Sequence, residues 1–198
     1  MKKLLFLFLG LSLLILLTFG LFGDHFTFMF SGEKGREFFA RADHWTGPLG
    51  AGLLISDLVL PIPTTVIIGS MGAVLGWVEA AIWGWIGLSL AGLTGYGLAR
   101  WGGEKLASRL ASEEEQSRYR HLFNHWGGLA VILSRMLPVL PEVLSVLAGL
   151  YGMKFSRFAA AVILGSIPPA LAFAWIGEKS VEHPGFGIWG FAGLMGII

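Results

Sequence analysis

Cysteine is absent from the 198 residues, and only 14% of them are charged. Without cysteine there is no disulfide framework, no thiolate nucleophile and no zinc–thiolate site. A soluble domain usually carries about 25% charged residues, so the charges are too few to cover a water-facing surface. The net charge of +1 offers no basic face for a nucleic-acid backbone. The composition therefore argues against a cytosolic enzyme, a disordered regulator and a nucleic-acid binder.

What the sequence does contain is apolar: 55% hydrophobic residues, with 29 glycines and 8 tryptophans. Membrane proteins tolerate glycine inside helices and place tryptophan at the membrane–water interfaces. These features predict an all-α polytopic integral membrane protein, with residues 1–198 as a single membrane domain.

The amino-terminal part predicts a membrane helix followed by an interfacial segment. Residues 4–22 are uncharged and long enough to cross a hydrocarbon core of ~30 Å as a helix. The alternative is a signal peptide, but the run exceeds the ~7–15 residues of such a segment and no small-residue cleavage site follows. Residues 24–46 mix phenylalanine with charges, which predicts an external amphipathic helix over 33–45 or, as the alternative, a solvated loop.

Prolines interrupt two apolar runs, at residues 47–72 and 127–152. The breaks are at Pro61 and Pro63 in the first run and at Pro138 and Pro141 in the second. Proline removes a backbone donor and clashes with the preceding turn, so each run is either a kinked span or a re-entrant hairpin of two half-helices. Non-helical backbone at membrane depth must be buried in protein or line a wet cavity.

Loop charge favours the re-entrant hairpins. Transmembrane helices are predicted at 73–100 and 155–177, a cytoplasmic connector at 101–126, and a terminal helix at 184–198. With re-entrant hairpins most Lys and Arg residues of the loops fall on the cytoplasmic side, together with the amino terminus, as the positive-inside rule requires. The unit of hairpin plus helix then occurs twice in opposite orientations, an inverted repeat typical of secondary transporters. The glycine pairs at 102–103 and 127–128 are interpreted as helix-end signals.

Four ionisable residues lie in or near apolar sequence: Asp57, Glu79, Arg135 and Glu142. A charge at a helix centre costs about 2.5–3.5 kcal/mol on insertion scales, so each needs a partner or a function. Arg135 is the strongest candidate for substrate binding, because its guanidinium can clamp a phosphate or carboxylate in bidentate geometry. The alternative is a structural salt bridge to Asp57 or Glu142.

The carboxylates are candidates for a proton relay or a gate. Glu142 follows Pro141 directly, where it would either cap the second half-helix or carry a proton. Asp57 precedes the first break and is given a proton or substrate role. Glu79 is the third candidate for the relay or gate, although the tryptophans that flank it favour an interfacial position at the head-group belt.

Hydroxyl side chains follow both breaks. Thr64, Thr65 and Ser145 either cap the second half-helices or donate hydrogen bonds to a head group. No nucleophile–base pair and no set of metal ligands is evident, so the sequence predicts no enzyme, no metal and no cofactor.

Several motifs in order resemble the DedA superfamily, also called VTT-domain or SNARE-associated Golgi-type membrane proteins. They lie at 60–63 (LPIP), 99–103 (ARWGG), 134–141 (SRMLPVLP), 153–158 (MKFSRF), 165–169 (GSIPP) and 175–177 (WIG). The resemblance spans about residues 47–177. One departure concerns the second hairpin, where many bacterial members carry a second arginine and this chain has Pro141 followed by Glu142.

The resemblance implies two opposed re-entrant hairpins and the transport or scrambling of lipids. Bacterial members are linked to the return of undecaprenyl phosphate across the inner membrane and to proton coupling, which implies a bacterial cytoplasmic membrane. Carried over by position, Arg135 is the hairpin arginine that meets a phosphate. The expected partners are an anionic lipid and protons, with no nucleic acid; a homo-oligomer stays open. The alternatives are a proton-coupled transporter of a soluble solute and a non-transporting membrane scaffold.

Overall fold

The computed structural model describes residues 2–58, 60, 62–110 and 113–183, and within these the chain is helical, with no strand. The chain forms two compact units, each built from separate stretches of sequence. The all-α prediction is confirmed for the described residues. Pro61 and the predicted terminal helix at 184–198 lie outside them.

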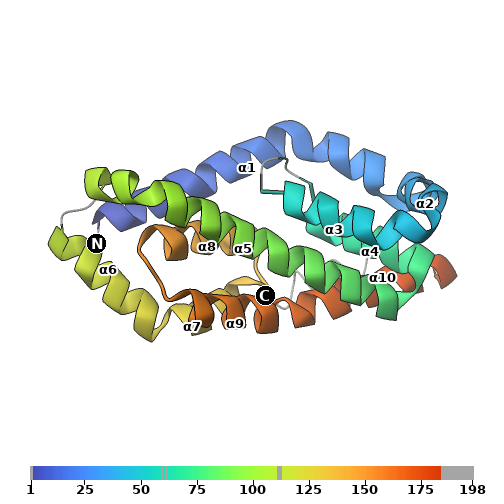
Figure 1. Ribbon diagram of the computed structural model, residues 1–198. Helices are drawn as coiled ribbons and strands as arrows, with labels where there is room; N and C mark the ends of the chain where they lie inside the picture. Colours follow the sequence, from blue (N-terminus) through green and yellow to red (C-terminus); the bar gives the residue numbers. More distant parts are fainter. Residues whose placement is uncertain (1, 59, 61, 111–112, 184–198) are drawn as a thin grey trace. The chain divides into compact units, whose positions relative to one another are not determined.

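The first unit comprises Met1–Leu17 and Gly92–Gly165. It contains the beginning of α1 (Lys2–Phe30), the later part of α5 (Trp77–Leu110), and then α6 (Glu113–His125), α7 (Gly127–Ser134), α8 (Leu140–Leu150) and α9 (Phe155–Gly165). Helix α7 packs on α9, α8 and α6, and the α7–α9 pair runs side by side in Figure 1. The core includes Tyr96 of α5, whose ring stacks on that of Phe158 with 4.5 Å between the centroids.

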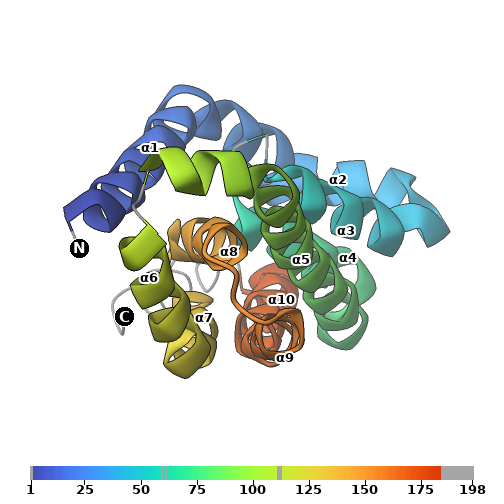
Figure 2. The ribbon, with the colours of Figure 1, turned by 60° about the vertical axis from the view of Figure 1, so that its left-hand side comes forward.

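The second unit comprises Thr18–Ala91 and the chain from Ser166 onward. Besides parts of α1 and α5 it contains α2 (Gly32–Arg41), the 3₁₀ turn η1 (Asp43–Trp45), α3 (Thr46–Ser56), α4 (Thr64–Leu75) and α10 (Ile167–Glu182). Helix α4 packs on α10, α2 and α3, and lies beside α10 in Figure 2.

Glycines allow the backbones of α4 and α10 to approach closely. A Cβ added at Gly177 would collide with the carbonyl oxygen of Gly69, and one added at Gly72 would collide with that of Ala174. Small residues at such crossings are typical of helix packing in membranes. The four residues therefore form the backbone-to-backbone contact of this unit.

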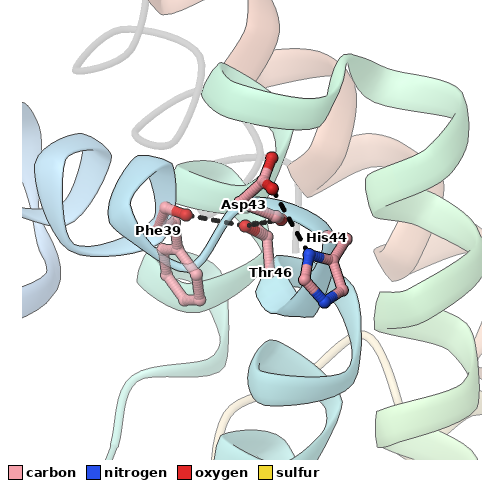
Figure 3. A network of polar contacts seen from close by, with 4 residues as sticks. All are labelled: Phe39, Asp43, His44 and Thr46. Carbon is pink, nitrogen blue, oxygen red and sulfur yellow. Dashed lines mark hydrogen bonds and ion pairs between the residues drawn. The ribbon is translucent and has the colours of Figure 1, made fainter.

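A hydroxyl holds the turn between α2 and α3 (Figure 3). Thr46 is fully buried, and its Oγ1 lies 2.6 Å from the carbonyl oxygen of Phe39 and 2.7 Å from that of Asp43. Its single proton is shared between these two acceptors, which satisfies backbone groups at the end of α2. On the exposed side of the turn, Asp43 Oδ2 lies 3.3 Å from His44 Nδ1.

Within the described part of the chain, two helical stretches are long and apolar enough to cross a membrane, Trp77–Gly103 and Phe155–Glu182. They overlap the helices predicted at 73–100 and 155–177. Their re-entrant neighbours and the inverted repeat stay predictions. Two expectations need adjustment: α1 runs past residue 22 to Phe30, and α5 continues through Gly102 and Gly103, so the helix-end interpretation of that glycine pair is wrong.

Candidate functional site

The second apolar run breaks between α7 and α8, as its prolines predicted. Helix α7 ends at Ser134, Arg135 is its C-cap, and α8 begins at Leu140. Pro141 occupies the first turn of α8, where its missing N–H is tolerated. Val139 precedes α8 with a φ of 68°, a conformation that is an outlier for a β-branched residue. Such strained positions concentrate at functional sites.

Arg135 is buried at this break, with 9% of its surface exposed. Its Nη2 donates to Ser145 Oγ at 3.2 Å, and Ser145 Oγ in turn donates to the carbonyl oxygen of Pro141 at 2.6 Å. Among the described residues, Arg135 Nε has no hydrogen-bond partner. A guanidinium carries five N–H donors, so most of its donor capacity is unused. The structure thus brings together two predicted binding residues, Arg135 and Ser145.

Two glycines make room for this side chain. A Cβ at Gly92 of α5 would collide with Arg135 Nη2 and lie 3.1 Å from its Cζ. A Cβ at Gly165 of α9 would lie 3.1 Å from Arg135 Cγ and 2.9 Å from Ile132 Cα. The guanidinium therefore rests on α5 and the aliphatic stem on α9. Both glycines escaped the sequence-based search for site residues, because a glycine has no side chain that would mark it as part of a site.

Glu142 lies in the first turn of α8 and is half-buried. Negative charge is favoured at a helix N-terminus, in agreement with the capping interpretation. Its Oε2 is buried without a hydrogen-bond partner among the described residues. Glu142 acts on Arg135 electrostatically, but the two side chains form no direct ion pair within 4.0 Å. The predicted salt bridge to Glu142 is therefore not formed in this structure.

The first break, in the other unit, is closed by Asp57. This residue is the C-cap of α3; its Oδ1 accepts from the N–H of Ile62 at 3.0 Å, and its Oδ2 accepts from Thr64 Oγ1 at 3.2 Å. Pro63 is the N-cap of α4. The carboxylate thus ties the end of α3 to the first residue of α4, and Thr64 turns its hydroxyl back to it.

The remaining predicted residues are outside these clusters. Thr65 is half-buried in the first turn of α4, and Glu79 is exposed in the first turn of α5, as an interfacial residue would be. Within the described ranges, no three His, Asp or Glu side chains converge as metal ligands.

Comparison with known proteins gives one family match and two sequence relatives. The family model of the VTT domain matches residues 62–179. Undecaprenyl phosphate transporter A of Bacillus subtilis is 26% identical over 144 residues, which cover 67% of this chain and 73% of that protein. An uncharacterized protein of Methanocaldococcus jannaschii is 35% identical over 65 residues, which cover 33% of this chain and 41% of that protein. No solved structure gives a significant match.

Proposed function

Because the chain belongs to the VTT domain family, as its motifs predicted, we propose that it is a membrane transporter that moves an anionic lipid across the bilayer. The Bacillus subtilis relative is named as a transporter of undecaprenyl phosphate, which makes a polyprenyl phosphate the first substrate to test. In this proposal the protein resides in a bacterial cytoplasmic membrane, with its amino terminus inside and both broken helix pairs re-entrant.

The observation that carries the proposal is the state of Arg135. A buried charge is costly unless it is paired and hydrogen-bonded, and this one has a single described partner, the Ser145 hydroxyl. A phosphate oxygen accepting from the free Nε–H and a neighbouring Nη would supply the bidentate contact that guanidinium geometry favours. The unused donors therefore support an anionic ligand better than a structural ion pair.

The neighbouring groups suggest how the ligand is held and released. The Ser145 hydroxyl accepts a hydrogen bond from Arg135 and donates one to the carbonyl oxygen of Pro141. It therefore keeps the guanidinium in place when no phosphate is bound. Glu142, in the first turn of α8, has a buried Oε2 with no hydrogen-bond partner among the described residues. Bound phosphate and ionised Glu142 would repel each other, so protonation of Glu142 would favour binding. This coupling provides the proposed role for a proton.

The test is reconstitution of the protein in liposomes that contain a fluorescent anionic lipid. The rate at which the head group becomes accessible to an added quencher is measured with and without a pH gradient, for wild type and Arg135→Ala. We expect Arg135→Ala to lower the rate at least tenfold, because the variant loses one to two charge-assisted hydrogen bonds to the phosphate. Wild type should respond to the gradient, and Glu142→Gln should abolish that response.

Two controls separate the site from the fold. Arg118→Ala removes an exposed charge on α6 and should transport like wild type. Arg135→Lys keeps the charge but loses the bidentate geometry of the guanidinium. Its transport rate should lie between those of wild type and Arg135→Ala. Transport by correctly folded Arg135→Ala at the wild-type rate would disprove the role of this residue. Movement of no lipid by the wild type would favour a soluble solute or a scaffold instead.

A further inference from the structure

Two arginine side chains converge at the C-terminal end of α8, whereas Arg135 lies near its N-terminal end. Gly152 follows this helix with a φ of 72°, a left-handed conformation that glycine adopts without steric cost. The position that a Cβ would occupy there lies 2.5 Å from Arg100 Nη1 and 3.6 Å from Arg120 Nε. The two guanidiniums, one from α5 and one from α6, therefore meet over a residue that has no side chain.

Two hydrogen bonds fix this arrangement. Tyr96, one turn before Arg100 on α5, donates its hydroxyl to the carbonyl oxygen of Met153 at 2.6 Å. Asn124, one turn after Arg120 on α6, accepts from the N–H of Lys154 at 3.2 Å through Oδ1. Each helix is thus tethered to the same short loop, and each tether lies one turn from an arginine. The convergence of the arginines follows from these anchors.

Among the side chains that the structure describes, no carboxylate forms an ion pair with Arg100 or Arg120. The ion pairs formed by described residues involve other cations, and Glu114 of α6 is paired with Arg118. From the distances to the common Cβ position, the two nitrogens are within about 6 Å of each other, where like charges repel. Both arginines are exposed, and exposed Lys154 follows two positions after Gly152.

The partial negative charge at the C-terminal end of α8 does not explain why the two arginines lie together. A helix C-terminus carries roughly half a negative charge, against two full positive charges. Its last carbonyls are also occupied: those of Leu147, Ala148 and Gly149 accept from backbone N–H groups at 3.0, 2.9 and 3.3 Å. The arginines are therefore not needed as a cap, and positive charge remains over the glycine.

We propose that Arg100 and Arg120 form a second anion site, specific for a phosphate monoester, over Gly152. Two guanidiniums beside a residue without a side chain match the several oxygens of a terminal phosphate, whereas the single negative charge of a phosphodiester head group would be held less well. The group could belong to a lipid or to soluble phosphate. The site is independent of Arg135, and its existence does not rest on lipid transport.

The test measures binding to the full chain in a neutral detergent by isothermal titration calorimetry. The probe is dihexanoyl phosphatidic acid, a short-chain lipid with a phosphate monoester, and the comparison ligand is dihexanoyl phosphatidylcholine. All proteins carry Arg135→Gln, so that binding at the other site does not contribute. We expect Arg100→Gln with Arg120→Gln to weaken phosphatidic acid binding at least tenfold, and phosphatidylcholine to bind far more weakly than phosphatidic acid.

The matched control is Arg118→Gln, which removes one exposed charge from α6 two residues before Arg120 and outside the cluster. It should change the affinity less than twofold. The paired substitutions Arg100→Lys and Arg120→Lys retain both charges and should bind with intermediate strength. Because Arg100 and Arg120 are exposed, their substitution should leave the variants folded to the same extent as the Arg135→Gln parent, which the elution volume and circular dichroism verify.

Competition with inorganic phosphate identifies the source of the ligand. Displacement of the lipid by millimolar inorganic phosphate would support a site that accepts soluble phosphate; failure to displace it would support a lipid head-group site that also needs the glycerol or acyl part. Equal binding by the double glutamine variant and its parent would overturn the proposal, as would an equal loss in Arg118→Gln. Neither result bears on transport through Arg135, which the liposome assay measures separately.

Discussion

Substitution of Gly92 by alanine should displace Arg135 without removing any polar group. The added methyl would occupy the space of Arg135 Nη2 and lie 3.0 Å from Val162 Cγ1. Val162 is fully buried on α9, so it cannot give way, and the guanidinium must move. The hydrogen bond to Ser145 at 3.2 Å would then be lost.

The magnitude follows from that bond. A hydrogen bond to a charged group contributes about 1.5–3 kcal/mol, which corresponds to between about tenfold and a hundredfold in an equilibrium or rate. We expect Gly92→Ala to slow lipid movement in the liposome assay by that factor. Replacement of glycine by alanine in a helix is otherwise favourable by about 1 kcal/mol, so any loss must come from the collision.

Gly97→Ala is the matched control, because it lies on the same helix with nothing within 4 Å of its Cβ position. It should leave transport unchanged and hold or raise the unfolding temperature. Ser145→Ala provides a second check. If Gly92→Ala acts by breaking the bond between Arg135 and Ser145, adding Ser145→Ala should cause little further loss, a non-additivity that residues in contact show. Wild-type transport by Gly92→Ala, or full additivity with Ser145→Ala, would refute the reasoning.

Three further predictions concern the fold and are measured by thermal unfolding in detergent. Gly177→Ala should lose about 1–3 kcal/mol of stability, because its methyl would strike the carbonyl of Gly69. Gly52→Ala, at a position with open space around its Cβ, should lose none. Equal unfolding temperatures for the two variants would contradict the close crossing of α4 and α10. Asp57→Ala should lose about 1–3 kcal/mol, since two donors at the first break lose their acceptor; an unchanged unfolding temperature would show that the carboxylate does not close the break. Val139→Gly should cost less than about 1.5–3 kcal/mol, the loss expected for removal of a packed valine side chain, because glycine adopts a φ of 68° without strain; a loss of the full packing energy would show that this conformation is not strained.

The helix breaks could be predicted from the sequence because a proline acts on its own turn of the helix. Proline excludes a continuous helix whatever its surroundings, so the end of α7 and the start of α8 follow from Pro138 and Pro141. Arg135 was also predictable, because a charge in a long uncharged run needs a reason. Both conclusions depend only on the neighbouring sequence.

The partners of Arg135 were not predictable in this way. Ser145 lies ten residues further along, and only the turn at the break, with its left-handed Val139, brings the hydroxyl to the guanidinium. Gly92 and Gly165 come from two other helices and contribute by having no side chain. A glycine that accommodates a charged group and one that accommodates a neighbouring helix look the same in a sequence. Tertiary packing alone distinguishes them.

The two breaks share a pattern of residues but differ in their electrostatics, and this difference bears on their roles. At the first break the charge is satisfied within the chain, since both oxygens of Asp57 accept hydrogen bonds from residues that the break separates. A carboxylate so engaged serves as a structural clamp between the end of α3 and the start of α4. At the second break, Arg135 and Glu142 each retain an unpartnered polar atom. Because unsatisfied buried groups require an explanation, we expect ligand and proton to act at the second break, and substitutions at the first to change stability before they change transport.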